Sequence, residues 1–248
     1  MSTEKIYSVI GIGIGPFNLG LAALIEPIED LSALFFDQSE GFDWHPGLML
    51  NNATLQVPFL ADLVTMADPT NKYSFLNYIK QSGRAYKFYI RENFFIYRRE
   101  YNEYCKWAAA QLSNLKFSHK VISIDPVDDV YKVTVIHTQT CVTTVYYTHK
   151  IVLGTGTSPH VPDFIDTEAL PNVIHASQYL YFKPQIQKNA SVTIIGSGQS
   201  AAEVFRDLLP ETQNGLQLKW FTRSSHFFPL DNKSKLTLEL TSPEYVDH

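Results

Sequence analysis

The chain has 248 residues, of which 45% are hydrophobic and 18% are charged, so it can bury a core of ordinary size. Its net charge of −5, with no basic stripe, argues against a nucleic-acid partner, which would need Lys and Arg to neutralise phosphates. The first residues have no signal-peptide pattern, and glycines break the apolar run at residues 9–25, which makes it a poor membrane span. We therefore expect a cytoplasmic protein that does not cross a membrane.

A strand, a glycine-rich turn, a helix and a second strand are predicted at the start of the chain. Residues 7–10 are apolar and end in glycines, and residues 34–36 form a second apolar run that ends at Asp37. Between the two runs, apolar residues follow at helical spacing, namely Leu19, Ala22, Ala23 and Ile25. This order is typical of a βαβ unit.

The middle of the chain combines a long irregular segment with helices and strands. Residues 38–72 lack periodicity, and a loop of this length in a compact domain is usually functional. Ser74 is a candidate cap for one helix, and a second helix is marked by Tyr101, Tyr104, Cys105, Ala108 and Leu112. Alternating runs predict an antiparallel meander at residues 121–124, 133–136 and 142–146, followed by a buried strand at residues 151–153.

A second βαβ unit is predicted after a linker that contains Pro159, Pro162 and Pro171. An apolar strand at residues 192–195 leads into another glycine turn, and the next strand is expected at residues 218–222. The sequence thus predicts an α/β fold with two Rossmann-like dinucleotide-binding domains, an inserted β-meander and an incomplete second domain. We place the first domain at residues 1–160 and the second at residues 161–248.

The first glycine turn contains Gly11, Gly13 and Gly15, followed by Pro16. Glycines are needed there because the backbone must turn tightly and let a pyrophosphate approach the N–H groups at the start of the helix. Pro16 takes the place of the third glycine in the GxGxxG pattern, and proline suits a first helical turn. Asp37 stands where an acid accepts hydrogen bonds from a ribose hydroxyl. We predict a dinucleotide site, the alternative being a tight strand-to-helix corner.

The second glycine turn fits the GxGxxG/A pattern directly. Its predicted cofactor-binding residues are Gly196, Gly198, Gln199, Ser200 and Ala201. The strand that follows is succeeded by Arg223 and Ser224 rather than by an acid. Because arginine pairs with a 2′-phosphate that a carboxylate would repel, we predict NADPH here, the alternative being an ordinary solvated arginine. The acidic residue after the strand of the first unit favours FAD in the first turn, and the basic residue after the strand of the second unit favours NADPH in the second.

Many segments of the chain resemble the lysine/ornithine N-monooxygenases, the flavin-dependent N-hydroxylases of siderophore biosynthesis. They occur in the family's order: GIGIGPFNL at residues 11–19, FDWHPGLML at 42–50, LQVPFL at 55–60, DLVT at 62–65, DPT at 68–70, FLNY at 75–78, GSGQSAAE at 196–203 and FPLD at 228–231. The resemblance implies a class B flavin monooxygenase fold, closest to the diamine and lysine branch. Because family members are considerably longer, it also implies a C-terminal truncation that leaves both domains incomplete.

The resemblance implies a reaction and its residues. NADPH reduces FAD, the reduced flavin captures molecular oxygen as a C4a-hydroperoxide, and the terminal amine of the substrate attacks it to become a hydroxylamine. Family position suggests that Gln56 lies near the reacting end of the flavin and NADP⁺, with Asn51 and Asn52 close by in sequence. We predict Gln56, His45 and Asn51 as catalytic residues, and Trp44, His45 and Gln56 in contact with the cofactors. For His45, a structural loop histidine is the alternative. The protein would position the flavin and keep water out.

The attacking amine has to be neutral. An amine such as that of lysine has a pKa of about 10.4 and is mostly protonated in water. Desolvation in an apolar pocket favours the neutral form. Candidates to line such a pocket are Trp44, His45, Met49, Phe59 and Leu60.

Two positions depart from the family's amino-acid hydroxylases. Ala61 stands where many of them have a lysine that grips the α-carboxylate, and Leu238 with Glu239 stand where ornithine enzymes tend to have Asn-Glu. Loss of a charge-assisted contact costs about 1.5–3 kcal/mol. We therefore favour an amine substrate without a carboxylate, such as putrescine, cadaverine, diaminopropane or histamine. The alternatives are lysine or ornithine with another residue in the lysine's role, and an inactive truncated fragment.

Two other classes of flavin enzyme also pair two nucleotide units. A pyridine-nucleotide disulfide reductase would need a redox-active cysteine pair, and the spacing of Cys105 and Cys141 forms neither a CxxC motif nor a zinc-ligand set. A Baeyer–Villiger-type monooxygenase would deliver oxygen to carbon or sulfur rather than to nitrogen. We expect the full-length protein to form a homo-oligomer and to need no metal.

Overall fold

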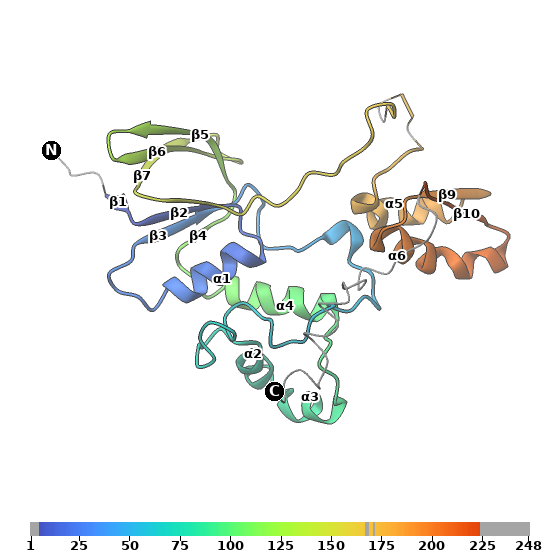
Figure 1. Ribbon diagram of the computed structural model, residues 1–248, viewed down its shortest axis with the longest axis horizontal. Helices are drawn as coiled ribbons and strands as arrows, with labels where there is room; N and C mark the ends of the chain where they lie inside the picture. The colour runs from blue at the N-terminus through green and yellow to red at the C-terminus, as the bar shows by residue number, and fades with distance from the viewer. Residues whose placement is uncertain (1–4, 167–168, 171, 224–248) are drawn as a thin grey trace. The chain divides into compact units, whose positions relative to one another are not determined.

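The computed structural model describes residues 5–166, 169–170 and 172–223. Its contacts divide the chain into two units (Figure 1). The first unit comprises Met1–Trp44 with Asn51–Ser158, and the second comprises His45–Leu50 with Pro159–His248.

A parallel sheet forms the base of the first unit, with the strand order β4-β3-β2-β8. Its strands are β2 (Val9–Ile12), β3 (Ala33–Phe36), β4 (Leu115–Lys116) and β8 (Ile151–Leu153), and α1 (Pro16–Ile25) connects β2 to β3. The predicted first βαβ unit and the predicted strand at 151–153 are thereby confirmed. Strand β4 was not predicted, because two residues carry no periodicity.

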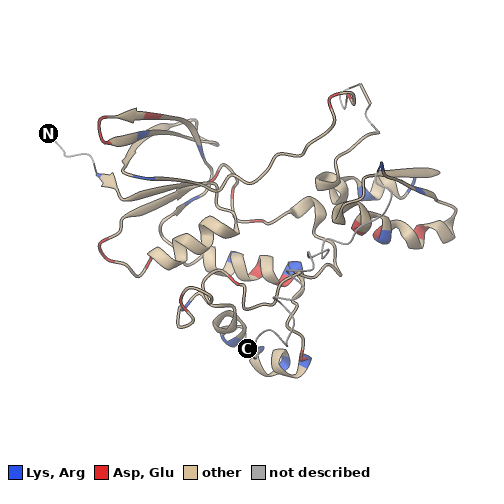
Figure 2. Cartoon of the chain, in the orientation of Figure 1, with Lys and Arg blue, Asp and Glu red and all other residues tan. Residues whose placement is uncertain are grey.

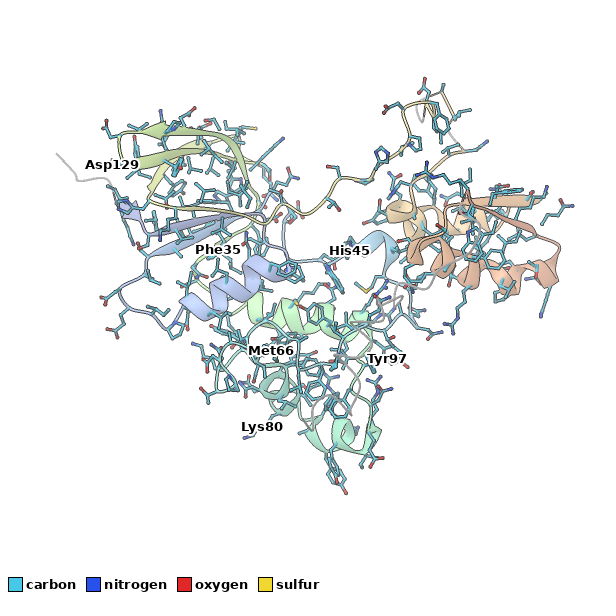
Figure 3. All side chains as sticks on the ribbon, viewed as in Figure 1. Phe35, His45, Met66, Lys80, Tyr97 and Asp129 are labelled. Atoms are coloured by element: carbon cyan, nitrogen blue, oxygen red, sulfur yellow. The ribbon has the colours of Figure 1, made fainter. Side chains whose placement is uncertain are left out.

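Successive side chains of β3 pack on opposite faces of the parallel sheet, as a strand requires. Phe35 belongs to the core that contains Leu19 and Ala22 of α1, and Figure 3 labels it between the sheet and that helix. Leu34 and Phe36 belong instead to the core on the other face. The sheet is therefore covered by α1 on one side and by a second sheet on the other.

The second sheet is the predicted meander. It contains β5 (His119–Val127), β6 (Val130–His137) and β7 (Thr143–Thr148), which pair antiparallel, and β1 (Ile6–Tyr7), which adds to β7 in parallel. Val133 and Val135 of β6 are fully buried against the parallel sheet. The meander is confirmed, whereas the parallel pairing of β1 was not predicted.

Three helices complete the first unit: α2 (Phe75–Gln81), α3 (Ala85–Arg91) and α4 (Arg98–Ala109). The Ser74 side chain accepts a hydrogen bond from the Asn77 N–H at 3.3 Å, so the predicted cap is confirmed. Helix α4 packs against α1, with Leu112 buried just beyond its end. Helix α3 has no buried residue, although Ala85, Phe88 and Tyr89 stand at helical spacing on one face, and it was not predicted.

The second unit contains the second predicted βαβ unit. Strand β9 (Ser191–Ile195) leads through α6 (Gln199–Leu208) and η3 (Leu209–Asn214) to β10 (Gln217–Phe221), which pairs with β9 in parallel. Before them lie the short helices η1 (Pro46–Leu48) and η2 (Ala176–Gln178) and the helix α5 (Tyr179–Ile186). Helix α5 was not predicted, and it carries Pro184 inside it.

Charges of both signs are interspersed on the described elements (Figure 2). On α4, Lys106 lies 3.2 Å from Asp43 and 3.5 Å from Glu103. Among the helices of the described residues, none has the length and the apolar character needed to span a bilayer.

Candidate functional site

The first glycine turn leaves β2 in a conformation that only glycine adopts readily. Gly13 has φ +84°, and a Cβ placed on it would lie 2.5 Å from the carbonyl oxygen of Gly154. Its N–H donates to the Phe36 carbonyl at 2.8 Å, which continues the ladder between β2 and β3 by one bond. The Gly154 N–H donates to the Ile12 carbonyl at 2.8 Å. Two glycine loops, after β2 and after β8, therefore meet at the carboxyl edge of the sheet.

Gly15 caps α1 and faces open space. Its backbone is extended at φ −81° and ψ 179°, and Pro16 occupies the first helical turn. Apart from its neighbours in the chain, a Cβ on Gly15 would come no closer than 3.9 Å to the protein, at the Gly154 carbonyl oxygen. The first N–H groups of a helix lack partners within it and carry a partial positive charge. The turn thus offers an anion an open approach to the N–H groups at the start of α1.

Asp37 holds this turn from the end of β3. One carboxylate oxygen accepts a hydrogen bond from the Ile14 N–H at 2.7 Å. The other accepts from the Ser39 N–H at 2.8 Å and from the Ser39 hydroxyl. A carboxylate has about four acceptor positions, so these contacts leave one for a ligand hydroxyl.

The second turn repeats the first in hydrogen bonding and in backbone shape. The Gly196 N–H donates to the Phe221 carbonyl at 2.8 Å, as the Gly13 N–H does to Phe36. Gly198 caps α6 with φ −79° and ψ 172°, close to the values of Gly15. A Cβ on Gly198 would have no atom within 4 Å. The two turns are therefore equivalent sites, one in each unit.

Because the two turns are equivalent, the glycine pattern of the first turn begins at Gly13 and not at Gly11. Gly196, Gly198 and Ala201 of the second turn correspond to Gly13, Gly15 and Asn18 of the first. The third position is thus Asn18 rather than Pro16, which corresponds to Gln199. Gly11 precedes the pattern and is buried within β2, where a Cβ would collide with the ring of Phe35. Contact of Gly11 with a cofactor stays a prediction, while its packing against Phe35 is established.

The residues that follow β3 and β10 differ in charge, as predicted, but the basic residue stands one position later than the acidic one. By the register of the two strand pairs, the residue equivalent to Asp37 is Thr222, and Arg223 is the residue after it. Arg223 is exposed. Among the other predicted residues, Gln199 donates to the Glu203 carboxylate at 2.9 Å and Ser200 is exposed. Ser224, Leu238 and Glu239 lie outside the described residues.

Trp44 and His45 are adjacent in sequence but belong to different units. The Trp44 N–H donates to the Asn102 side-chain oxygen at 2.9 Å, and its ring meets Tyr101 edge-on at 5.3 Å. Asn102 is buried and also donates to Asp43 at 2.7 Å, so it fixes the backbone around Trp44. Sequence reasoning missed Asn102 because only its place on α4 relates it to this loop.

His45 has a left-handed backbone and begins η1. Its φ is +48°, and its carbonyl accepts from the Leu48 N–H at 2.9 Å. Non-glycine residues seldom adopt this conformation, and they occur most often at turns and functional sites. Met49 lies at the end of the same short helix, in the second unit. The structure thus gives His45 a backbone role, and a flavin contact stays a prediction.

Gln56 and Asn51 lie on an exposed segment of the first unit. This segment runs alongside residues 94–98 through hydrogen bonds from Leu55 to Ile96 and from Phe59 to Phe94, both at 2.8 Å. Both candidate side chains are exposed. The Asn51 side chain accepts a hydrogen bond from Arg99, a cation that the sequence did not single out.

Phe59 lines an apolar cavity of about 430 Å³ in the first unit. The cavity is lined by Phe59, Leu76, Ile79, Ala85, Phe88, Tyr89, Glu92, Asn93 and Phe94. Leu60 and Ala61 are exposed beside Phe59 in sequence, and Trp44 is not among the lining residues. Of the residues expected to surround the amine, the structure therefore places only Phe59 in this cavity.

The cysteines do not form a redox pair. Both are free, Cys105 buried in α4 and Cys141 exposed in the turn before β7. Burial raises the pKa of the Cys105 thiol well above its usual value, so little reactive thiolate forms. Within the described residues, no three His, Cys, Asp or Glu side chains come together as a metal site.

Two parallel βαβ units with equivalent glycine turns define a protein with two dinucleotide-binding folds. A family model described as L-lysine 6-monooxygenase/L-ornithine 5-monooxygenase matches residues 5–248. The chain therefore belongs to the lysine/ornithine N-monooxygenase family, which confirms the resemblance seen in the sequence.

Relatives and solved structures agree with this family. The chain is 53% identical to the putrescine N-hydroxylase of Shewanella oneidensis, over 99% of the chain and 49% of that protein. The FAD-bound cadaverine monooxygenase of the desferrioxamine pathway from Erwinia amylovora matches with 50% identity and a TM-score of 0.90, over 98% of the chain and 57% of that structure. An ornithine N-hydroxylase of Kutzneria sp. 744 with reduced FAD, NADP⁺ and ornithine has 28% identity and a TM-score of 0.82, over 98% and 59%.

The solved structures confirm the predicted α/β fold of the flavin monooxygenase type. The chain spans about half the length of the curated relatives it matches.

Proposed function

We propose that the full-length protein is an FAD- and NADPH-dependent monooxygenase that hydroxylates a terminal nitrogen of a diamine for hydroxamate siderophore biosynthesis. The observation that carries the proposal is the pair of equivalent glycine turns, followed by Asp37 in the first unit and by Thr222 and Arg223 in the second. The relatives named putrescine N-hydroxylase and cadaverine monooxygenase support the diamine as substrate.

FAD fits the first turn. The open space at Gly15 lets a pyrophosphate reach the start of α1, and Asp37 keeps an acceptor position for a ribose hydroxyl. When bound there, FAD supplies the electron transfer and the oxygen activation that side chains cannot perform. The chain's own part is to hold the dinucleotide, orient it and exclude water.

NADPH fits the second turn. Gly198 leaves the same open approach to α6, and Gln199 and Ser200 provide further polar groups in its first turn. Thr222 puts a neutral side chain where Asp37 stands in the first unit, so no carboxylate repels a 2′-phosphate. Arg223, exposed beside it, can pair with that phosphate in a forked contact.

Trp44, Asn51 and Gln56 of the first unit are proposed to serve the reacting end of the flavin. Asn102 fixes the backbone at Trp44, and Arg99 holds the Asn51 side chain. The exposed amide of Gln56 can both donate and accept hydrogen bonds there. His45 stays a predicted catalytic residue.

A diamine fits the charge around position 61. Ala61 is exposed and has no cation for a carboxylate, whereas a lysine there would attract an amino acid.

The test is a product assay with NADPH and oxygen on the full-length protein. Hydroxylamine formation from putrescine, cadaverine, histamine, lysine and ornithine is compared for the unaltered protein, Ala61→Lys and the exposed control Ala67→Lys. We expect product from the diamines only, with Ala61→Lys alone lowering diamine turnover at least tenfold, roughly one charge-assisted contact. Product from the amino acids but not from the diamines would overturn the substrate proposal.

Cytoplasmic location is proposed from the need for NADPH. The homo-oligomer stays a prediction.

A further inference from the structure

One peptide of the first turn is held at both ends. The carbonyl oxygen of Gly13 accepts a hydrogen bond from the Asn18 side-chain amide at 2.7 Å, and the N–H of the same peptide, from Ile14, donates to Asp37 at 2.7 Å. The Asn18 amide also reaches the Ile12 carbonyl at 3.3 Å. Asn18 is 2% exposed, so the oxygens it binds face the protein interior.

The second turn holds the equivalent carbonyl by a different side chain. Ala201, at the position of Asn18, has no donor, and the Gly196 carbonyl instead accepts from the Trp220 indole N–H at 2.6 Å. The Trp220 ring stacks on Phe205 of α6 with centroids 5.0 Å apart. In both turns a side-chain N–H thus binds the carbonyl of the glycine. Asn18 donates it from the helix in the first unit, and Trp220 donates it from the neighbouring strand in the second.

We propose that Asn18 and Trp220 are positioning residues, Asn18 for the FAD pyrophosphate and Trp220 for the NADPH pyrophosphate. The inference rests on the proposed function, since it assigns the two turns to those cofactors. Gly13 at φ +84° and Gly196 at φ +129° lack the steric restriction that limits other residues. Without its side-chain N–H partner, the carbonyl end of the peptide after each glycine is held less firmly. Its oxygen can then turn toward the phosphates, which it would repel.

Gly154 makes room for Asn18 where the glycine pattern calls for a small residue. A Cβ on Gly154 would collide with the Asn18 side-chain amide. The third position of the pattern is normally small so that helix and strand pack closely. In the first turn, Gly154 in the loop after β8 leaves the space for a larger side chain. Asn18 fills that space, and its amide binds two carbonyls.

The test measures the two cofactors separately in the full-length protein. Asn18→Ala is expected to raise the dissociation constant for FAD about tenfold, the equivalent of one hydrogen bond, and to leave the dissociation constant for NADP⁺ unchanged. Trp220→Phe keeps an aromatic ring that can stack on Phe205, and it removes the N–H together with one ring of the indole. It is expected to raise the dissociation constant for NADP⁺ by a similar factor and to leave FAD binding unchanged.

Asn114→Ala is the matched control. Its side-chain amide also donates to a carbonyl of α1, that of Ala22 at 3.3 Å, but away from the turn. A merely structural role for Asn18 would make the two asparagine variants alike in FAD affinity. Asn18→Asp, which keeps the shape and replaces the donor by a negative charge, is expected to bind FAD more weakly than Asn18→Ala.

Three results would overturn the inference, and they differ in what they say about the proposed function. Unchanged FAD affinity in Asn18→Ala, or unchanged NADP⁺ affinity in Trp220→Phe, would refute it while the proposed function stands. Failure of the unaltered full-length protein to bind FAD at all would refute the proposed function and this inference together.

Discussion

Gly11 and Phe35 are packed so closely that no side chain can stand between them. Gly11 lies in the middle of β2, and a Cβ built on it would overlap the ring of Phe35 on the neighbouring strand β3. The first glycine of the GIGIGP segment is therefore a core residue, while the pattern that faces a ligand begins at Gly13.

Gly11→Ala is expected to destabilise the first unit by about 1–3 kcal/mol through overpacking. Phe35→Leu in the same chain should relieve the collision and recover part of that loss. The measurement is urea unfolding of both variants and of Phe35→Leu alone. Additive losses in the double variant would contradict the contact.

Thr222→Asp is expected to reverse the preference for the nicotinamide cofactor. It places a carboxylate at the position of Asp37, where the carboxylate would repel the 2′-phosphate of NADPH and accept hydrogen bonds from the ribose of NADH. Arg223→Ala removes the proposed phosphate partner and should raise the KM for NADPH roughly 10- to 150-fold, the range of one charge-assisted contact. KM values for NADPH and NADH are the measurement.

The exposed Lys219 of β10 provides the control for these two variants. Lys219→Ala removes a positive charge from the same strand and should leave the ratio of the two KM values unchanged. The account is contradicted if Arg223→Ala behaves like Lys219→Ala.

Tyr104 connects α4 to the loop before α2 by hydrogen bonds, and its replacement should lower the free energy of unfolding. Its hydroxyl donates to the Tyr73 carbonyl at 2.7 Å and accepts from the Leu63 N–H at 3.2 Å, all in the buried core. Tyr104→Phe leaves both backbone groups unpaired and is expected to cost about 1–3 kcal/mol. Tyr86→Phe, on the exposed side of α3, should stay within about 0.5 kcal/mol of the unaltered protein.

The pH dependence of the same variant has a definite sign. Burial raises the pKa of Tyr104 above its ordinary value of 10.0, so the folded state favours the neutral phenol. The stabilisation is complete below about pH 10 and is lost as the pH rises further, because only the unfolded chain then ionises. The free energy of unfolding should therefore fall less steeply above pH 10 in Tyr104→Phe, and an unchanged slope would contradict this.

Local patterns predicted much of the fold. Both βαβ units and the meander follow from apolar runs of the right period next to glycine turns, and Ser74 is a cap that a single residue reveals. The strand β4 and the helix α3 were missed because two residues have no period and seven residues make only about two helical turns.

The site was predicted less completely, because contacts between distant residues decide which glycines of the two turns correspond. The pairing of Gly13 with Phe36 and of Gly196 with Phe221 fixes which glycines correspond, and it moves the third position from Pro16 to Asn18. Gly154 reaches this turn only through the pairing of β8 with β2.

The central claim, that the first turn holds FAD and the second holds NADPH, is tested most directly by Gly15→Ala and Gly198→Ala. Neither added Cβ would meet a protein atom closer than 3.9 Å, so both variants should fold. The measurement is the flavin absorbance of the purified full-length protein and its bleaching by NADPH without oxygen. We predict that Gly15→Ala is colourless and that Gly198→Ala keeps its flavin but is no longer bleached. Flavin retained in Gly15→Ala, or lost from Gly198→Ala, would contradict the assignment.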